Sequence, residues 1–112
     1  MQTKQERREY NQKYKKEGYG PCIYLITNKL TGEQYIGATV NLRQRMFAHW
    51  CSLRGGRHHS ERFVEAFYRD GKSAFEVSVL EYLAERLLYQ REAYYIITMQ
   101  PAYNDTHKKS MA

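Results

Sequence analysis

The sequence CIYLITNKLTGEQYIG, residues 22–37, decides the fold because it places two short β-like runs around a turn. The first run is Cys22–Asn28 and the second is residues 33–37, and each combines β-branched and aromatic side chains. Residues 29–32 separate the two runs and end in Gly32, which tolerates the backbone conformations of a tight turn. The stretch therefore predicts a β-hairpin.

Two helices are predicted directly after the hairpin. Asn41 stands where an N-cap is expected, and the helix that it begins runs to residue 53, before the stop at residues 55–56, which are both glycine. Ser60 opens a second helix, which ends at residues 70–71, an Asp-Gly pair.

The last third of the chain completes an α+β domain. Residues 75–79 alternate with period two and predict a strand, and residues 84–99 predict a helix that Pro101 terminates. The order ββααβα predicts a small three-stranded sheet flanked by helices, preceded by a basic N-terminal helix or arm. The chain is expected to divide into a basic arm with a hinge at residues 1–20, one folded domain at residues 21–105 and a basic tail at residues 106–112.

Length and composition exclude several classes of protein. A chain of 112 residues forms one domain, and none of its apolar runs approaches the roughly 18 to 20 residues that cross a bilayer. Its start carries charge without an apolar segment typical of a secretory signal, and its two cysteines, Cys22 and Cys51, cannot build a disulfide framework. We therefore expect a cytoplasmic protein in a reducing compartment, with no membrane partner.

Positive charge is concentrated in two segments. The chain has 18 Lys and Arg against 12 Asp and Glu, a net charge of +6. Residues 1–17 hold six cations and three anions, and residues 40–62 hold five arginines against Glu61 alone. Clustered cations on a small domain favour a phosphate backbone as partner, because binding releases counterions. The alternative is two ordinary solvated faces.

Three charged or ionisable residues interrupt apolar helix faces. Arg45 and His49 are spaced with the apolar residues of the first helix, and Glu92 lies between apolar positions of the last one. We expect all three to face inward, where an unpaired charge is costly. One interpretation is an internal Arg45–Glu92 salt bridge beside a hydrogen-bonded His49. The other is a cleft that holds a phosphate and a metal.

Several of these residues occur in an order that resembles a known family, the GIY-YIG endonucleases. Cys22-Ile23-Tyr24 and Tyr35-Ile36-Gly37, with tyrosines eleven residues apart, resemble its paired motif, and Cys22 replaces the first Gly. Arg45 and His49 follow at the family's spacing. His58 is similar to a second histidine of the phage intron-encoded homing branch, Glu92 to the metal-binding Glu and Asn104 to the closing Asn. The resemblance spans residues 22–104.

The resemblance implies a hydrolase acting on DNA, of the homing or mobile-element type and phage-encoded. It implies that Tyr24 is the general base, that Tyr35 positions water or phosphate, and that Arg45 holds the scissile phosphate. His49 and His58 relay or orient a proton, with cations such as Arg45, His49 and the metal stabilising the phenolate. Glu92 binds one divalent metal, Mg²⁺ with Mn²⁺ as a substitute, and Asn104 ties the active-site strand in place. Gly37 is structural.

The expected partner is double-stranded DNA. The candidate contacts are cations of the arm and of the segment around the first helix: Arg7, Arg8, Lys13, Lys15, Lys16, Arg43, Arg54 and Arg57. Target choice is expected from the arm, from loops, from a second subunit in a homodimer or from a partner protein. Two alternatives stay open: a restriction or structure-specific repair nuclease on the same scaffold, and a non-catalytic nucleic-acid-binding protein.

Overall fold

A computed structural model describes residues 20–104 and contains the predicted elements in the predicted order. The basic arm and the basic tail lie outside the described residues. The elements are β1 (Cys22–Asn28), β2 (Gln34–Thr39), α2 (Leu42–Arg54), α3 (Glu61–Asp70), η1 (Lys72–Ala74), β3 (Phe75–Tyr82), η2 (Glu85–Leu87), α4 (Leu88–Met99) and η3 (Ala102–Asn104). The α+β class is confirmed.

The sheet has three strands in the order β2-β1-β3, and both pairs are antiparallel. β1 therefore lies in the centre and its side chains are covered on both faces. The hairpin register sets Tyr24 opposite Gly37, a pairing that matters for the site described below. Cys22, at the start of β1, is fully buried, and burial raises the pKa of its thiol to about 11. Cys22 is thus a protonated packing residue at neutral pH.

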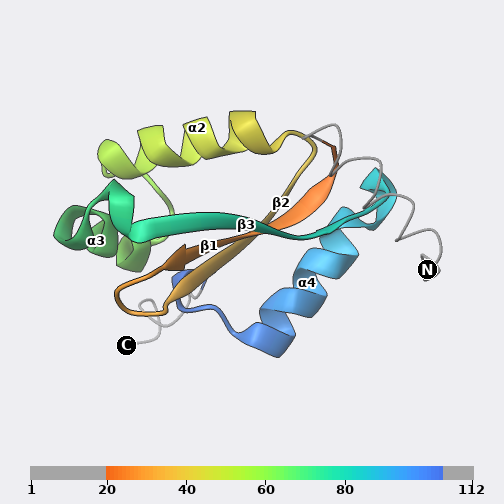
Figure 1. The fold of residues 1–112 in the computed structure, drawn as a ribbon. Helices are drawn as coiled ribbons and strands as arrows, with labels where there is room; N and C mark the ends of the chain where they lie inside the picture. Colours follow the sequence, from red (N-terminus) through yellow and green to blue (C-terminus); the bar gives the residue numbers. More distant parts are fainter. Residues whose placement is uncertain (1–19, 105–112) are drawn as a thin grey trace.

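Helices cover the two faces of the sheet differently. In Figure 1, α2 and α3 lie on one side of the strands and α4 lies on the other. Alternation along β1 sends Tyr24 and Ile26 into the core beneath α2 and α3, and Ile23 and Leu25 into the core beneath α4. The molecule therefore has two separate apolar clusters, one on each side of a single thin sheet.

The helix ends follow the sequence signals, with one shift. The side chains of Asn41 and Ser60 accept hydrogen bonds from backbone N–H groups three residues later and begin α2 and α3. The helix predicted from residue 84 begins only at Leu88, because residues 85–87 form a 3-10 turn first. Its C-cap, Gln100, has a left-handed φ of 48° directly before the proline that stops the helix.

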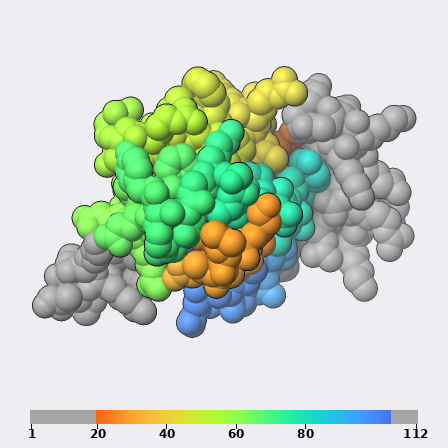
Figure 2. Space-filling view, turned by 60° about the vertical axis from the view of Figure 1, so that its left-hand side comes forward, coloured from red at the N-terminus to blue at the C-terminus, as the bar shows by residue number. Residues whose placement is uncertain are grey.

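The hairpin turn is the most exposed part of the sheet. In Figure 2 it forms an orange projection between the green α3–β3 segment and blue α4. Residues 29–32 are all exposed, and Leu30 presents 70% of its surface to solvent. β3 continues beyond its predicted end, to Tyr82, because its outer half pairs with the start of β1. Within residues 20–104 no helix has the length and apolar character of a membrane span.

Candidate active site

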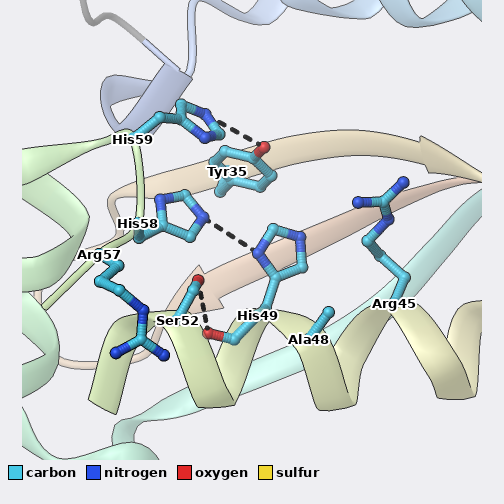
Figure 3. A pocket seen from close by; sticks show the side chains of 8 residues that line it. All are labelled: Tyr35, Arg45, Ala48, His49, Ser52, Arg57, His58 and His59. Atoms are coloured by element: carbon cyan, nitrogen blue, oxygen red, sulfur yellow. Dashed lines mark hydrogen bonds between the residues drawn. The ribbon is translucent and has the colours of Figure 1, made fainter. Parts of the chain in front are cut away.

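A cavity of about 350 Å³ opens between β2, α2 and the α2–α3 connection. Most of the residues that line it have a polar or basic side chain, and Figure 3 shows them. They are Tyr35, Arg45, Ala48, His49, Ser52, Arg57, His58 and His59. Four residues predicted as catalytic, Tyr35, Arg45, His49 and His58, therefore line one cavity, although they come from three separate segments of the chain.

Tyr24 reaches this site across a glycine. Its ring lies over Gly37, the residue opposite it in the hairpin. A Cβ atom on Gly37 would stand 2.2 Å from the Tyr24 hydroxyl oxygen and 2.3 Å from its ring carbon Cζ. No real side chain tolerates that separation, so Gly37 supplies the space in which the phenol lies. The predicted structural role of Gly37 has this steric cause.

The two histidines form a chain of short hydrogen bonds with Tyr24. The Tyr24 hydroxyl lies 2.6 Å from His49 Nε2, and His49 Nδ1 lies 3.0 Å from His58 Nε2. The backbone N–H of Ser60 donates to His58 Nδ1 at 3.1 Å. Tyr24, His49 and His58 are all at least nine-tenths buried. His49 faces inward as expected, and it is a hydrogen-bonded link between the other two side chains.

Arg45 extends from the same side of α2 as His49 but is exposed rather than buried. It lines the cavity one turn before buried His49, with its side chain open to solvent. It does not form the internal salt bridge with Glu92. Throughout residues 20–104 the ion pairs are Arg62–Glu33, Arg69–Asp70 and Arg91–Glu81. An exposed guanidinium beside buried phenols is free to meet an incoming phosphate.

The electrostatics of the site favour neutral side chains. Burial raises the pKa of Tyr24 far above its usual value, and it raises the pKa of Tyr35 to about 12, while nearby Arg45 lowers both. Burial, together with the neighbouring His58, lowers the pKa of His49 to about 3, and burial lowers that of His58 to about 4. The expectation that His49 stabilises a phenolate as a cation is therefore wrong. It is uncharged at neutral pH.

Glu92 lies beside the same strand, on the apolar face of α4, between buried Leu88 and the partly buried Tyr95. It is half-buried on α4, and its carboxylate accepts a hydrogen bond from the backbone N–H of Ala38, next to Gly37. Burial raises its pKa, and that hydrogen bond and Arg45 oppose the rise. Residues 20–104 contain no group of three or more His, Cys, Asp and Glu that could hold a metal. A lone carboxylate without an ion pair fits Mg²⁺, which keeps several water ligands and shares substrate oxygens.

Asn104 is anchored to the backbone of the strand that carries Tyr35. Its Oδ1 accepts from Ile36 N–H at 2.7 Å, and its Nδ2 donates to the Ile36 carbonyl at 2.8 Å. β2 is an edge strand, so these groups have no neighbouring strand to pair with. Asn104 and Glu92 together satisfy successive outward-facing groups of β2, at Ile36 and Ala38.

The cavity also contains groups that sequence reasoning did not place in it. His59 Nε2 lies 3.5 Å from the Tyr35 hydroxyl, and its ring stacks on His58 with centroids 4.4 Å apart. Its position next to His58 in the sequence is the signal that could have identified it. The backbone N–H of Ser60, which does not line the cavity, is a further group that no side chain in the sequence indicates. Of the predicted DNA contacts, Arg57 lines the cavity, Arg43 and Arg54 are exposed on α2, and the five arm residues lie outside the described part of the chain.

The fold matches that of proteins of known type. The chain is similar to the catalytic domain of the homing endonuclease I-TevI, with a TM-score of 0.64 and 28% identity, covering 71% of this chain and 88% of that one. A mutant form of the I-TevI catalytic domain matches with a TM-score of 0.65 and 28% identity, covering 71% and 84%. At this identity the likeness extends beyond a shared sheet topology.

The sequence comparisons agree with the structural ones. The chain is 30% identical over 84 residues to intron-associated endonuclease 1 of Enterobacteria phage T4, covering 73% of this chain. It spans about a third, 34%, of the length of that relative. The family model that describes the GIY-YIG catalytic domain matches residues 20–104, which are also the residues that the structure describes. This chain therefore belongs to the GIY-YIG family.

Proposed function

We propose that this protein is a divalent-metal-dependent DNA endonuclease of the homing or mobile-element type, which hydrolyses phosphodiester bonds. The observation that carries the proposal is the cavity, which gathers Tyr35, Arg45 and the histidine pair next to Tyr24. The GIY-YIG catalytic domain and the two named endonucleases that resemble this chain support the same reaction.

Hydrolysis needs a base for water and a cation for the phosphate, and the cavity offers both. We assign the base to Tyr24: as a phenolate it removes a proton from water while the water oxygen attacks phosphorus and the leaving oxygen departs. Arg45 binds the scissile phosphate through its two-pronged guanidinium, and its charge favours the Tyr24 phenolate. Tyr35, buried at the wall of the cavity, positions the water or the phosphate.

Glu92 is the residue that we propose to hold the metal. The charge of its carboxylate raises the pKa of both Tyr24 and Tyr35, and the carboxylate accepts a hydrogen bond from the N–H of Ala38. When bound there, Mg²⁺ or Mn²⁺ would neutralise the negative charge that develops on the phosphoryl and leaving oxygens. One carboxylate, waters and DNA oxygens complete such a site.

DNA binding is proposed to rest on cations around the cavity and in the arm. Arg57 lies in the cavity wall, and Arg43 and Arg54 extend from the same helix segment that carries Arg45 and His49. The phage T4 relative is about three times longer than the matching stretch, so specificity in the present chain is a separate question. The arm, a second copy of the chain or a partner protein are the sources that we propose.

Incubation with supercoiled plasmid tests the function directly. We expect nicked circles with Mg²⁺ or Mn²⁺ and none with EDTA, and nicked circles should precede linear DNA because one active site cuts one strand at a time. Tyr24→Phe, which keeps the ring and removes the base, is the control and should leave the plasmid intact. Metal-independent binding without any cleavage would instead identify a non-catalytic nucleic-acid-binding protein.

The cleavage products also separate the endonuclease types. Cutting within a defined short motif indicates a restriction nuclease, and preference for branched substrates indicates a repair nuclease.

Neutralising Arg7, Arg8, Lys13, Lys15 and Lys16 tests the arm. We expect weaker binding to all sequences, and the slope of log K against log salt concentration should flatten by up to about 0.9 per lost phosphate contact. An unchanged slope would show that the arm does not contact DNA.

A further inference from the structure

The hydrogen bonds behind Tyr24 have a direction that can be read from their far end. The backbone N–H of Ser60 can only donate, and the atom that it meets is Nδ1 of His58. Nδ1 of His58 therefore accepts and carries no proton. Because a neutral imidazole has one protonated nitrogen, the proton of His58 is on Nε2. Burial keeps both histidines uncharged, so this rule applies to each of them.

The same reasoning passes to the next ring. Nε2–H of His58 lies 3.0 Å from Nδ1 of His49, so it donates and the His49 nitrogen accepts. The proton of His49 is then on Nε2, which lies 2.6 Å from the Tyr24 hydroxyl oxygen. His49 therefore donates to Tyr24. The opposite assignment would set an N–H of Ser60 against an N–H of His58, two donors 3.1 Å apart in a buried position.

We propose that the Ser60 backbone amide, acting through His58, fixes His49 as the tautomer that donates a hydrogen bond to the Tyr24 oxygen. His58 is thus a positioning residue, and the inference rests on the proposed function only in naming Tyr24 as the base. A donor aimed at the phenolic oxygen stabilises the phenolate more than the phenol. His49 cannot remove the Tyr24 proton, because its nitrogen facing Tyr24 already carries one.

This direction leaves the O–H of the neutral Tyr24 phenol without an acceptor, a cost of the neutral form that is relieved when the phenolate forms. Tyr24 has no hydrogen-bond partner other than His49 among residues 20–104, so its own O–H is without an acceptor there. It is buried to 2% exposure, where an unsatisfied donor is costly. That proton is the one that is lost when the phenolate forms, and the hydrogen bond from His49 remains in place.

The end of the chain of bonds is held rigidly. Ser60 is fully buried and is the N-cap of α3, where its hydroxyl accepts from Phe63 N–H at 3.3 Å. The His58 ring packs edge-on against Tyr35 and Phe63, with centroids 5.4 and 5.1 Å apart. The start of α3 at Ser60 therefore sets the direction of the His49–Tyr24 hydrogen bond at the sheet, acting through the side chains of His58 and His49.

Nitrogen NMR of the whole chain measures the tautomers directly. In ¹⁵N-labelled protein at neutral pH, protonated and bare imidazole nitrogens resonate far apart, and the signals are assigned by replacing each of the four histidines singly with glutamine. We expect protonated Nε2 and bare Nδ1 for both His49 and His58. Protonated Nδ1 on His49, or two interconverting tautomers, would overturn the proposal.

Two variants at His58 distinguish hydrogen bonding from packing. His58→Gln keeps an N–H at the position of Nε2, so we expect the His49 tautomer to persist and cleavage to stay within about threefold. His58→Asn is too short to reach His49, so the tautomer becomes mixed and cleavage falls about ten- to a hundredfold, while the protein stays folded. Equal behaviour of the two variants would show that His58 acts only through packing. If the wild-type tautomers are as expected but no metal cleaves DNA, the endonuclease proposal fails and the tautomer assignment stands.

Discussion

The two faces of the sheet differ in what their side chains require. Beneath α2 and α3 the cluster is aromatic, and its tyrosines carry hydroxyl groups that must find partners, as Tyr24 does with His49 and Tyr103 with Asn28. Beneath α4 the buried cluster is aliphatic, formed by residues such as Ile23, Leu25 and Leu88. Aromatic hydroxyls need hydrogen-bond partners as well as space, so the α2–α3 face forms the cavity. The buried residues of the α4 face contribute packing, and the group that α4 adds to the proposed site is Glu92.

Two carboxylates near α4 show the same difference within one region. Glu81, on β3, is 5% exposed and accepts from Arg91 at 2.7 Å and from the Tyr95 hydroxyl at 3.0 Å. Glu92 is half-buried and has no ion pair among the described residues, and its charge raises the pKa of the tyrosines at the cavity. Glu81 is satisfied within the fold. Glu92 remains available for a cation from outside.

Replacing Glu92 should produce the largest effect on function. Glu92→Gln removes the proposed metal ligand, so we expect cleavage to fall by a factor of about a thousand or more. Without an ion pair to break, the free energy of unfolding should change by less than about 1 kcal/mol. DNA affinity measured without metal should stay equal or rise, since an anion facing phosphate is lost. Substantial residual Mg²⁺-dependent cleavage by the folded variant would contradict the assignment.

The matched substitution at Glu81 should have the reverse outcome. Glu81→Gln leaves the largely buried Arg91 guanidinium without its counterion, so we expect a loss of about 3 kcal/mol in the free energy of unfolding. Metal-dependent cleavage per folded molecule should be unchanged. Urea unfolding and cleavage assays on the same preparation separate the two quantities. If stability is unaffected, the contrast between the two carboxylates is wrong.

Gly37 tests the close approach of the phenol. Gly37→Ala puts a methyl group where the Tyr24 hydroxyl now lies, so we expect a loss of about 1 to 3 kcal/mol in stability and at least a tenfold loss of cleavage. Ile23→Val on the aliphatic face is the control: it should cost about 0.5 to 1.5 kcal/mol and leave cleavage intact. Equal cleavage by both variants would mean that the two faces are equivalent.

The smallest expected effect is on stability against mild acid. The pKa values of His49 and His58 are lowered in the folded state, so the unfolded chain binds more protons below about pH 6.5 and stability falls as the pH falls. Between pH 7 and pH 6 the two histidines together should cost about 1 kcal/mol. Urea unfolding at both pH values measures it, and the loss should be smaller in His58→Gln. No loss in the wild type would show that the rings are not buried as neutral groups.

Local signals account for most of the fold. The caps at Asn41 and Ser60, the stop at Pro101 and the alternation of the hairpin each depend on residues within about four positions, and the structure confirms them. The last helix begins at Leu88 rather than at the predicted residue 84, because a 3-10 turn at residues 85–87 satisfies the same apolar pattern as a helical turn. Spacing alone also indicated that His49 lies on the inner face of its helix, which the structure confirms.

The sequence by itself determined the elements, the residue types available for chemistry and their order along the chain. Only the tertiary structure decided their partners: Arg45 is exposed, Glu81 forms the buried ion pair, and a backbone amide at Ser60 orients His49. The reason is that caps and alternation are set by neighbours along the chain. Contacts between residues tens of positions apart depend on how helices pack on the sheet, and a shift of a single turn would exchange one partner for another.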